Sequence, residues 1–200
     1  LISNSGLLKA NGGIIKLSAA TAKNLSRSSV NIGSSGLIIA RSVNDKTGKV
    51  VIGSPTNEKI KIAGKIDVSG HRSLTPSGTI IVRGRSVTHN GKIFARGGTG
   101  GKVNIISKDT LKLDGSIFAQ GTKEKGGSVL FLSEKSISST PKTVVDVSGA
   151  NKGGRIRSLA KSTNISSGTF KSNSKGGKGG NIDLTADRVE ISNANIELSL

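Results

Sequence analysis

The sequence contains no cysteine, methionine, tryptophan or tyrosine, and its only aromatic side chains are four phenylalanines. The absence of cysteine excludes disulfides, thiol catalysis and cysteine-ligated metals. The scarcity of aromatic rings argues against a surface that stacks the bases of single-stranded nucleic acid. The two histidines, His71 and His89, have no acidic neighbours at ligand spacing. The sequence therefore predicts neither a metal site nor a cofactor.

Acidic residues are also scarce. The chain carries 12 Asp and Glu against 30 Lys and Arg, which gives a formal net charge of +18 over 200 residues. Such a balance favours association with polyanions but does not identify one, and we expect no specific nucleic-acid partner. The chain has no signal peptide at its start and no apolar run long enough to cross a bilayer, so we do not expect it to span a membrane.

Glycine is abundant, with 28 copies, and it marks an internal repeat. Glycine-rich starts lie near residues 12, 48, 78, 100, 126, 153 and 179. The step between starts varies from 23 residues (Gly78 to Gly101) to 35 residues (Gly13 to Gly48). A repeat with a variable step indicates that insertions fall in turns while the strands keep their places.

Inside each repeat the apolar residues alternate with polar ones, as in Val103 and Ile105 or Leu111 and Leu113. Short runs with a period of two are typical of strands with one buried face, and no stretch has the spacing of a helix. Three such runs per repeat predict a right-handed parallel β-helix of about seven coils. Stacking would place these apolar residues above one another in the core: Val50, Val103, Val129, Ile156 and Ile182.

Two details of this pattern lead to further predictions. Ser158 occupies a core position at which other coils have an apolar residue, so that coil is the least regular. Five glycines precede the third strands, and we expect the sharp corner at each to require a positive φ. These glycines are Gly36, Gly64, Gly91, Gly115 and Gly168.

The repeat resembles that of the filamentous haemagglutinin-like exoproteins of Gram-negative bacteria. The resemblance is carried by GGNIDLTA at Gly179–Ala186, GGKVNI at Gly100–Ile105 and GKIDVSG at Gly64–Gly70. The Asn-Pro motifs of that family's secretion domain are absent, so residues 1–200 resemble the shaft, a single β-helix segment of a larger exoprotein. The resemblance implies a secreted, cell-surface adhesin, exported by an outer-membrane two-partner transporter, that binds a glycan or protein receptor on host or bacterial cells.

The strongest candidate for a binding site is a set of basic turns. Each turn lies between a third strand and the next glycine-rich start, so the turns should stack along one edge and attract a linear polyanion such as a sulfated glycan. The candidate residues are Arg72, Arg96, Lys123, Lys125, Lys152, Lys175 and Lys178.

A second candidate lies on the outer surface of the third strands. Their alignment predicts one outward ladder with these members: Ile39, Asp67, Phe94, Phe118, Asp146, Lys171 and Glu197. Phe94 and Phe118 fall on adjacent coils, where the rings could stack and bind a sugar. Asp67 and Asp146 are three coils apart, about 14 Å, which is wider than glycoside hydrolysis requires. We therefore expect no catalytic residues.

Three other functions remain open. The segment could be the shaft of a contact-dependent toxin-delivery protein, in which it only separates a receptor tip from an effector domain. It could belong to a carbohydrate-active β-helix enzyme, although the ladder supplies no close pair of carboxylates. A non-specific nucleic-acid binder fits the charge but not the lack of aromatic residues.

Overall fold

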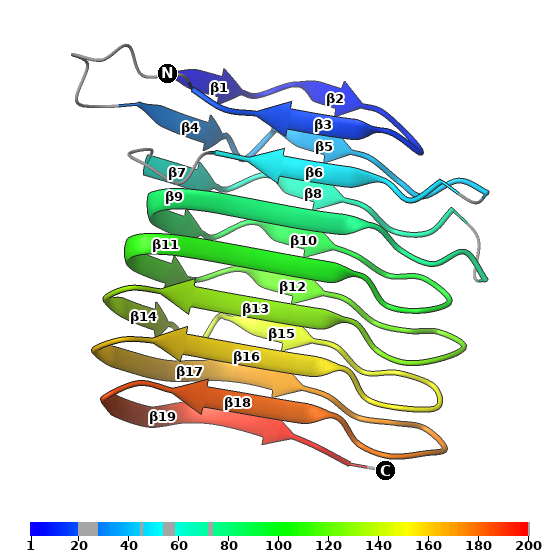
Figure 1. Cartoon of the computed structure of the whole chain (residues 1–200), viewed down its shortest axis with the longest axis vertical. Helices are drawn as coiled ribbons and strands as arrows, with labels where there is room; N and C mark the ends of the chain where they lie inside the picture. The colour runs from blue at the N-terminus through cyan, green and yellow to red at the C-terminus, as the bar shows by residue number, and fades with distance from the viewer. Residues whose placement is uncertain (20–27, 45, 54–58, 72–73, 200) are drawn as a thin grey trace.

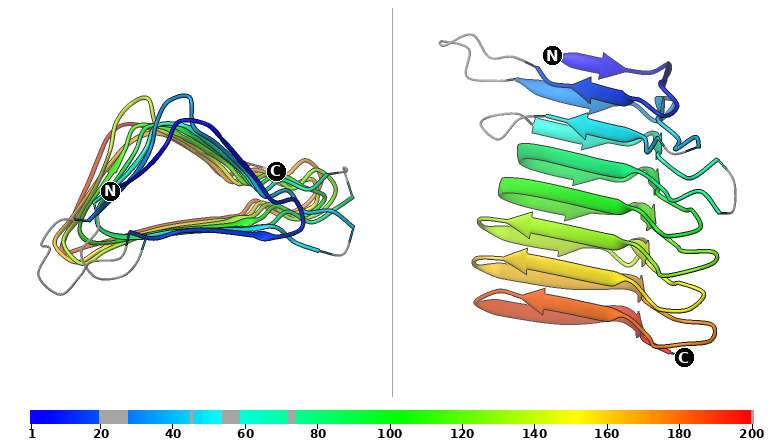
Figure 2. Two further views of the ribbon diagram at one scale, coloured as in Figure 1. Left: turned by 90° about the horizontal axis from the view of Figure 1, so that it is seen from above. Right: turned by 45° about the vertical axis from the view of Figure 1, so that its right-hand side comes forward.

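The computed structural model describes residues 1–19, 28–44, 46–53, 59–71 and 74–199. In this part of the chain all regular structure is β, and the 19 strands pair in parallel into one wound sheet (Figure 1). Seen along its axis, the molecule has a triangular outline (Figure 2). We name its three sides the first, second and third faces, in the order in which each coil visits them after a glycine-rich start.

The first face lies in front in Figure 1, and its strands run to the left. It contains β3 (Ile14–Leu17), β6 (Lys49–Ile52), the first parts of β9 (Thr79–His89) and β11 (Lys102–Leu113), β13 (Ser128–Ser133), β16 (Arg155–Ala160) and β18 (Asn181–Thr185). The chain returns to the right behind this face while it descends from the N-terminus. The solenoid is therefore right-handed, the hand expected for parallel crossovers.

The other two faces form the back of the molecule. The second face contains β1 (Ile2–Asn4), β4 (Ser29–Ile32), β7 (Lys59–Ile62), the ends of β9 and β11, β14 (Ser136–Ser139) and the starts of β17 (Thr163–Lys171) and β19 (Arg188–Glu197). The third face contains β2 (Leu7–Lys9), β5 (Leu37–Ile39), β8 (Lys65–Asp67), β10 (Lys92–Phe94), β12 (Ser116–Phe118), β15 (Val144–Asp146) and the ends of β17 and β19.

The predicted right-handed β-helix of about seven coils is confirmed, with one difference in detail. The strands β9 and β11 each continue from the first face to the second, and β17 and β19 continue from the second to the third. These coils therefore do not have three separate short strands. In β11 the corner is made by a local irregularity between Ser107 and Thr110, where the register against β9 shifts.

The core is built from the predicted inward ladder. Register pairs Val50 with Ile80, then Val103, Val129 and Ile156 in successive coils, and all five side chains are fully buried. Ile182 continues the ladder and is partly buried. Each coil buries its inward side chains only by stacking on its neighbours, which is how a solenoid obtains a continuous core.

The glycines before the third strands have a different role from the predicted one. Of the five, only Gly168 has a positive φ, of +99°. At Gly64 a Cβ atom would collide with the carbonyl oxygen of Gly36, and at Gly91 with that of Gly64. Glycine is needed at these corners mainly because the backbones of adjacent coils approach too closely for a side chain. The expectation of positive φ at Gly36, Gly64, Gly91 and Gly115 was wrong.

The irregular coil contains a small polar network in its core. Ser158 lies in register between Phe131 and Leu184 and is buried, as predicted. Its hydroxyl donates to Oδ1 of the fully buried Asn164 at 3.2 Å, and Nδ2 of Asn164 donates to the carbonyl oxygen of Ser158 at 2.8 Å. Buried polar groups are tolerated when they satisfy one another. The sequence showed the serine but not its partner.

This network leads to a prediction about stability. Asn164→Leu alone should lower the free energy of unfolding by about 1–3 kcal/mol, because it leaves the Ser158 hydroxyl buried without its partner. The double variant Ser158→Val, Asn164→Leu should recover part of that loss, because the Ser158 hydroxyl is gone as well, while the buried Ser166 hydroxyl, which donates to Asn164 Oδ1 at 3.4 Å, still loses its acceptor. Urea unfolding of the wild type, both single variants and the double variant measures the coupling. If the double variant loses as much unfolding free energy as the two single variants together, Ser158 and Asn164 do not interact and the network is wrong.

Candidate polyanion-binding groove

The turns that join the third face to the first stack at one corner of the triangle (Figure 2). They are ordered by bridges between successive coils that link Gly97 to Gly121, Gly121 to Gly149 and Gly149 to Ser174. A second row of bridges links Lys125 to Lys152 and Lys152 to Lys178. The turns therefore continue the parallel pairing of the strands, and their cations are carried on a regular backbone.

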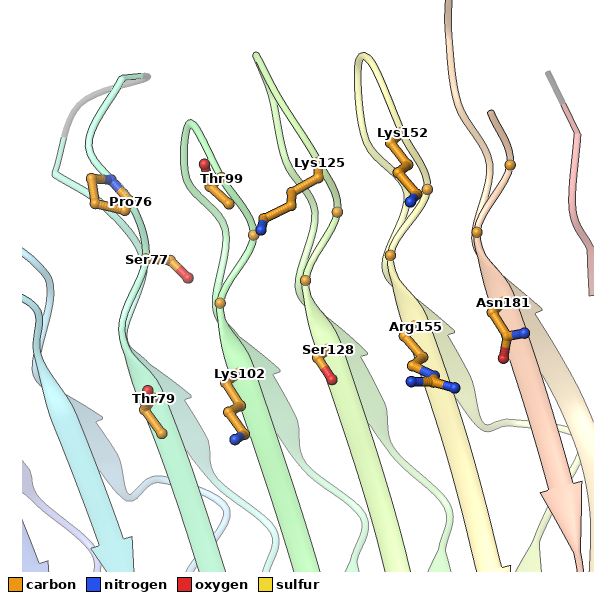
Figure 3. Close-up of a pocket in the computed structure, with 18 of the residues that line it drawn as sticks. Pro76, Ser77, Thr79, Thr99, Lys102, Lys125, Ser128, Lys152, Arg155 and Asn181 are labelled. Atoms are coloured by element: carbon orange, nitrogen blue, oxygen red, sulfur yellow. The ribbon is translucent and has the colours of Figure 1, made fainter. Parts of the chain in front are cut away.

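A groove runs along the rod between these turns and the starts of the first-face strands (Figure 3). It crosses five coils, from Thr79 to Asn181, and has a volume of about 800 Å³. Its lining contains five cationic side chains, which are Lys102, Lys125, Lys152, Arg155 and Lys178. All five are exposed to solvent.

The cations stand on two rims. Lys125, Lys152 and Lys178 form the turn rim, with one cation in each of three successive coils. Lys102 and Arg155 belong to the strand rim, in which register places Ser128 between them. Figure 3 shows Lys125 and Lys152 on the turns and Lys102 and Arg155 at the starts of the strands. A ligand in the groove would meet positive charge from both sides.

The floor between the rims is made of paired glycines: Gly100–Gly101, Gly126–Gly127, Gly153–Gly154 and Gly179–Gly180. At Gly126 a Cβ atom would collide with the carbonyl oxygen of Val147, and at Gly154 with that of Gly127. Close stacking of the coils thus forces glycine here, and the lack of side chains opens the groove. The backbone amides of Gly126 and Gly153 already donate to the backbone carbonyl oxygens of Lys152 and Lys178. These amides are therefore not free to bind an anion, and the cationic side chains must do so.

No acidic side chain is among the lining residues of this described part of the chain. The nearest acid in the sequence is Glu124, which precedes Lys125 in its turn and accepts a hydrogen bond from the Thr99 hydroxyl. A concave surface with a single sign of charge concentrates the field of its cations and attracts counter-ions more strongly than a convex one. The arrangement therefore favours an extended polyanion.

Only some of the predicted basic turn residues line this groove. Lys125, Lys152 and Lys178 do, and Lys175 lines a separate cavity toward the third face, beside Asn173 and Asp146. Lys123 is exposed on its turn and lines neither cavity. Arg72 lies outside the described residues.

Arg96 has a role that the sequence did not indicate. Its guanidinium carbon lies 5.0 Å from the centre of the Phe94 ring and 4.4 Å from that of Phe118. The two rings are stacked at 5.5 Å, as the ladder predicted. Arg96 thus covers the aromatic pair by cation–π contact instead of lining the groove. Lys65 Nζ also lies 4.8 Å from the centre of the Phe94 ring, so a sugar that stacked on the pair would have to displace one or both cations. The binding role of Phe94 and Phe118 stays a prediction.

The third-face ladder has the predicted register. Asp67 pairs with Phe94, Phe118 with Asp146, and Lys171 with Glu197. Two coils of aromatic side chains thus separate the two aspartates. The carboxylate of Asp67 is held instead by Arg41, whose Nη2 lies 2.7 Å from its Oδ2.

The shifted carboxyl groups of the described chain are all more acidic than usual. Burial would raise the pKa of Asp67, but hydrogen bonds from Arg41 and Ser69 outweigh it and the pKa is lowered. Hydrogen bonds from Arg85 and Lys135 lower the pKa of Asp109. Lys171 and Asn173 lower that of Glu197. A glycosidase general acid needs the opposite, a raised pKa.

The sequence reasoning missed Lys102 and Arg155 as members of the site. Each follows a Gly-Gly pair directly and precedes an inward residue, Val103 or Ile156. Because side chains alternate along a strand, that position must point outward beside the basic turn. Alternation along the strand therefore predicts an outward side chain at this position, and the stacked turns show that it faces the groove.

The described residues contain no group of three or more His, Cys, Asp and Glu side chains that could hold a metal ion. Within the same residues there is no helix long and apolar enough to cross a membrane. Fold and site together define the chain as a right-handed parallel β-solenoid with a cationic groove along one corner. Comparison with protein-family models, curated proteins and solved structures gives no significant match.

Proposed function

We propose that this chain is a rod segment of a secreted, filamentous haemagglutinin-like adhesin that attaches to cell surfaces through anionic glycans. The observation that carries the proposal is the glycine-floored groove, which presents five cations and no acid among its lining residues. The repeat motifs support the family, and the stacked coils support a stiff rod. The segment performs no chemistry in this proposal.

Attachment would be electrostatic and multivalent. Each exposed ion pair is weak, contributing about 0.2–1 kcal/mol, and is screened by salt. The turn rim repeats a cation in three successive coils, so several weak contacts can form with one linear ligand at once. Contacts to one chain add through effective concentration, which raises the overall affinity well above that of any single pair.

The location and partners follow from the same proposal. An adhesin of this family would be exported through an outer-membrane two-partner transporter and would act at the cell surface. Its receptor would be a glycan or a protein on a host cell or a neighbouring bacterium. The basic groove favours the anionic glycan among these, because a neutral receptor would gain nothing from five exposed cations.

The shaft of a contact-dependent toxin-delivery protein remains the second candidate. The same solenoid would then be a spacer, and the groove would be only a solvated edge. A carbohydrate-active enzyme is a weaker candidate. Its carboxylates would have to be close together with one pKa raised, whereas Asp67 and Asp146 lie three coils apart and the pKa of Asp67 is lowered.

Binding to immobilised heparin, lipopolysaccharide and a neutral glycan across a salt series tests the proposal. We expect retention on the two anionic surfaces at low salt, a steep loss as salt rises, and no retention on the neutral glycan. No binding to either anionic surface would favour the spacer. Salt-independent binding to the neutral glycan would also overturn the proposal and would direct attention to Phe94 and Phe118.

A further inference from the structure

The two rims of the groove carry their cations with different periods. On the turn rim Lys125, Lys152 and Lys178 follow one another coil by coil, about 4.8 Å apart along the rod. On the strand rim register gives a ladder in which cations alternate with neutral polar residues: Thr79, Lys102, Ser128, Arg155 and Asn181. Successive cations on this rim are therefore two coils apart, roughly 10 Å.

The floor determines how a ligand could lie. The paired glycines present no side chain, so a chain laid parallel to the rod axis meets no obstacle from coil to coil. A chain laid across the groove would instead run into the stacked turns on one side (Figure 3). The shape therefore favours one extended polymer that follows the axis over about five coils.

The chemistry of the lining distinguishes between polyanions. None of its residues is aromatic in this described part of the chain, so nucleic-acid bases would find no ring on which to stack. Ser128 places a hydroxyl group between the two cations of the strand rim, and Thr79 and Asn181 place a hydroxyl and an amide group on the coils beyond them. Such groups suit the many hydroxyls of a sugar chain.

We propose that the groove binds a single linear polysaccharide with at least one sulfate or carboxylate per disaccharide, extended parallel to the rod axis. The two-coil period of Lys102 and Arg155 is close to the length of an extended disaccharide, so successive anionic groups can reach successive cations. The proposal rests on the proposed function, because it specifies the ligand and its orientation for the same surface.

The first test is the dependence of affinity on ligand length. The cations extend over three coil steps, about 14 Å, so affinity should rise steeply up to about four sugar units and then level off. Chondroitin sulfate oligosaccharides of defined length, titrated by calorimetry at low salt, provide the series. An affinity that keeps rising steeply with length, or one that a disaccharide already saturates, would contradict axial binding in this groove.

The second test uses two variants with the same change of net charge. The groove variant carries Lys125→Gln, Lys152→Gln and Lys178→Gln, and the matched variant carries Lys112→Gln, Lys123→Gln and Lys175→Gln. All six lysines are exposed, so both variants should fold, which thermal unfolding checks. We expect the groove variant to bind about thirtyfold more weakly, from roughly a factor of three per ion pair, and the matched variant within about threefold of wild type.

The outcomes distinguish axial binding in the groove from the proposed function, which requires only that the chain attach to anionic glycans. Binding to anionic glycans that weakens equally in both variants would overturn the groove and leave attachment by the basic edge intact. If the wild type binds no anionic glycan at all, both the groove proposal and the proposed function are wrong. A single-stranded DNA of equal charge that displaces the oligosaccharide at lower concentration would show a nucleic-acid site and overturn the polysaccharide proposal.

Discussion

Gly48→Ala is expected to lower the free energy of unfolding by about 3 kcal/mol or more, because the added methyl group has no room. An ideal Cβ at Gly48 would lie inside the carbonyl group of Ala40, and both atoms of that carbonyl belong to backbone that cannot rotate away. Ala40 follows β5 and Gly48 precedes β6, so the two residues lie at the ends of the same turn. The turn would have to open there, which moves the start of β6 out of its register with β3 and β9. Chemical unfolding followed by circular dichroism measures the loss.

Gly176→Ala is the matched control, since Gly176 lies in an equivalent turn between the third and first faces. A Cβ there would meet nothing within 4 Å, and its φ is not positive. The substitution should leave stability unchanged or raise it slightly, because alanine has less freedom than glycine in the unfolded chain. Equal effects of the two substitutions would show that backbone crowding across the turn is not what requires glycine at position 48.

Stability should fall by about 3 kcal/mol between pH 6.5 and pH 4 because of His89. His89 is fully buried in register between Ile62 and Leu113, and neither ring nitrogen has a hydrogen-bond partner. Burial lowers its pKa from 6.5 to about 4, and the nearby backbone of Ser116 opposes this shift only in part. In this window the unfolded chain binds a proton that the folded chain excludes, so acid favours unfolding.

His89→Leu should remove this pH dependence, since Leu113 already fills the same position in the next coil. His71→Gln is the control, because His71 is exposed and its replacement should leave the dependence in place. The lowered pKa values of Asp67, Asp109 and Glu197 also make acid destabilising, but only as the pH falls to their ordinary values of 3.8 and 4.5 and below, so they overlap the His89 window only at its acid end. Parallel pH curves for the wild type and His89→Leu would contradict the assignment.

The sequence predicted the fold and much of the register because each repeat contains, within about 23–35 residues, the pattern that forms one coil. A Gly-Gly start followed by alternating apolar residues fixes which side chains point inward, and those residues do stack coil upon coil. The outward third-face ladder, with Phe94 beside Phe118, was predicted by the same parity and is confirmed. Such patterns can be read from one chain because each coil contacts only its neighbours.

The parts that could not be predicted depend on three-dimensional spacing. The requirement for glycine at Gly64 and Gly91 comes from contact between coils, which the sequence of one corner does not show. The position of Arg96 over the two rings depends on a side-chain rotamer. The groove itself combines a turn from one part of each coil with the start of the next strand, and alternation alone does not reveal its depth.

Lysine footprinting tests the binding groove most directly. The folded chain would be reductively methylated with and without a chondroitin sulfate octasaccharide, and each lysine would be scored by mass spectrometry. Protection of Lys102, Lys125, Lys152 and Lys178, with Lys112 and Lys123 still modified, is the predicted result, because the first four line the groove. Uniform protection of all six lysines, or protection of Lys112 and Lys123 alone, would contradict a groove that binds an anionic polysaccharide along the rod.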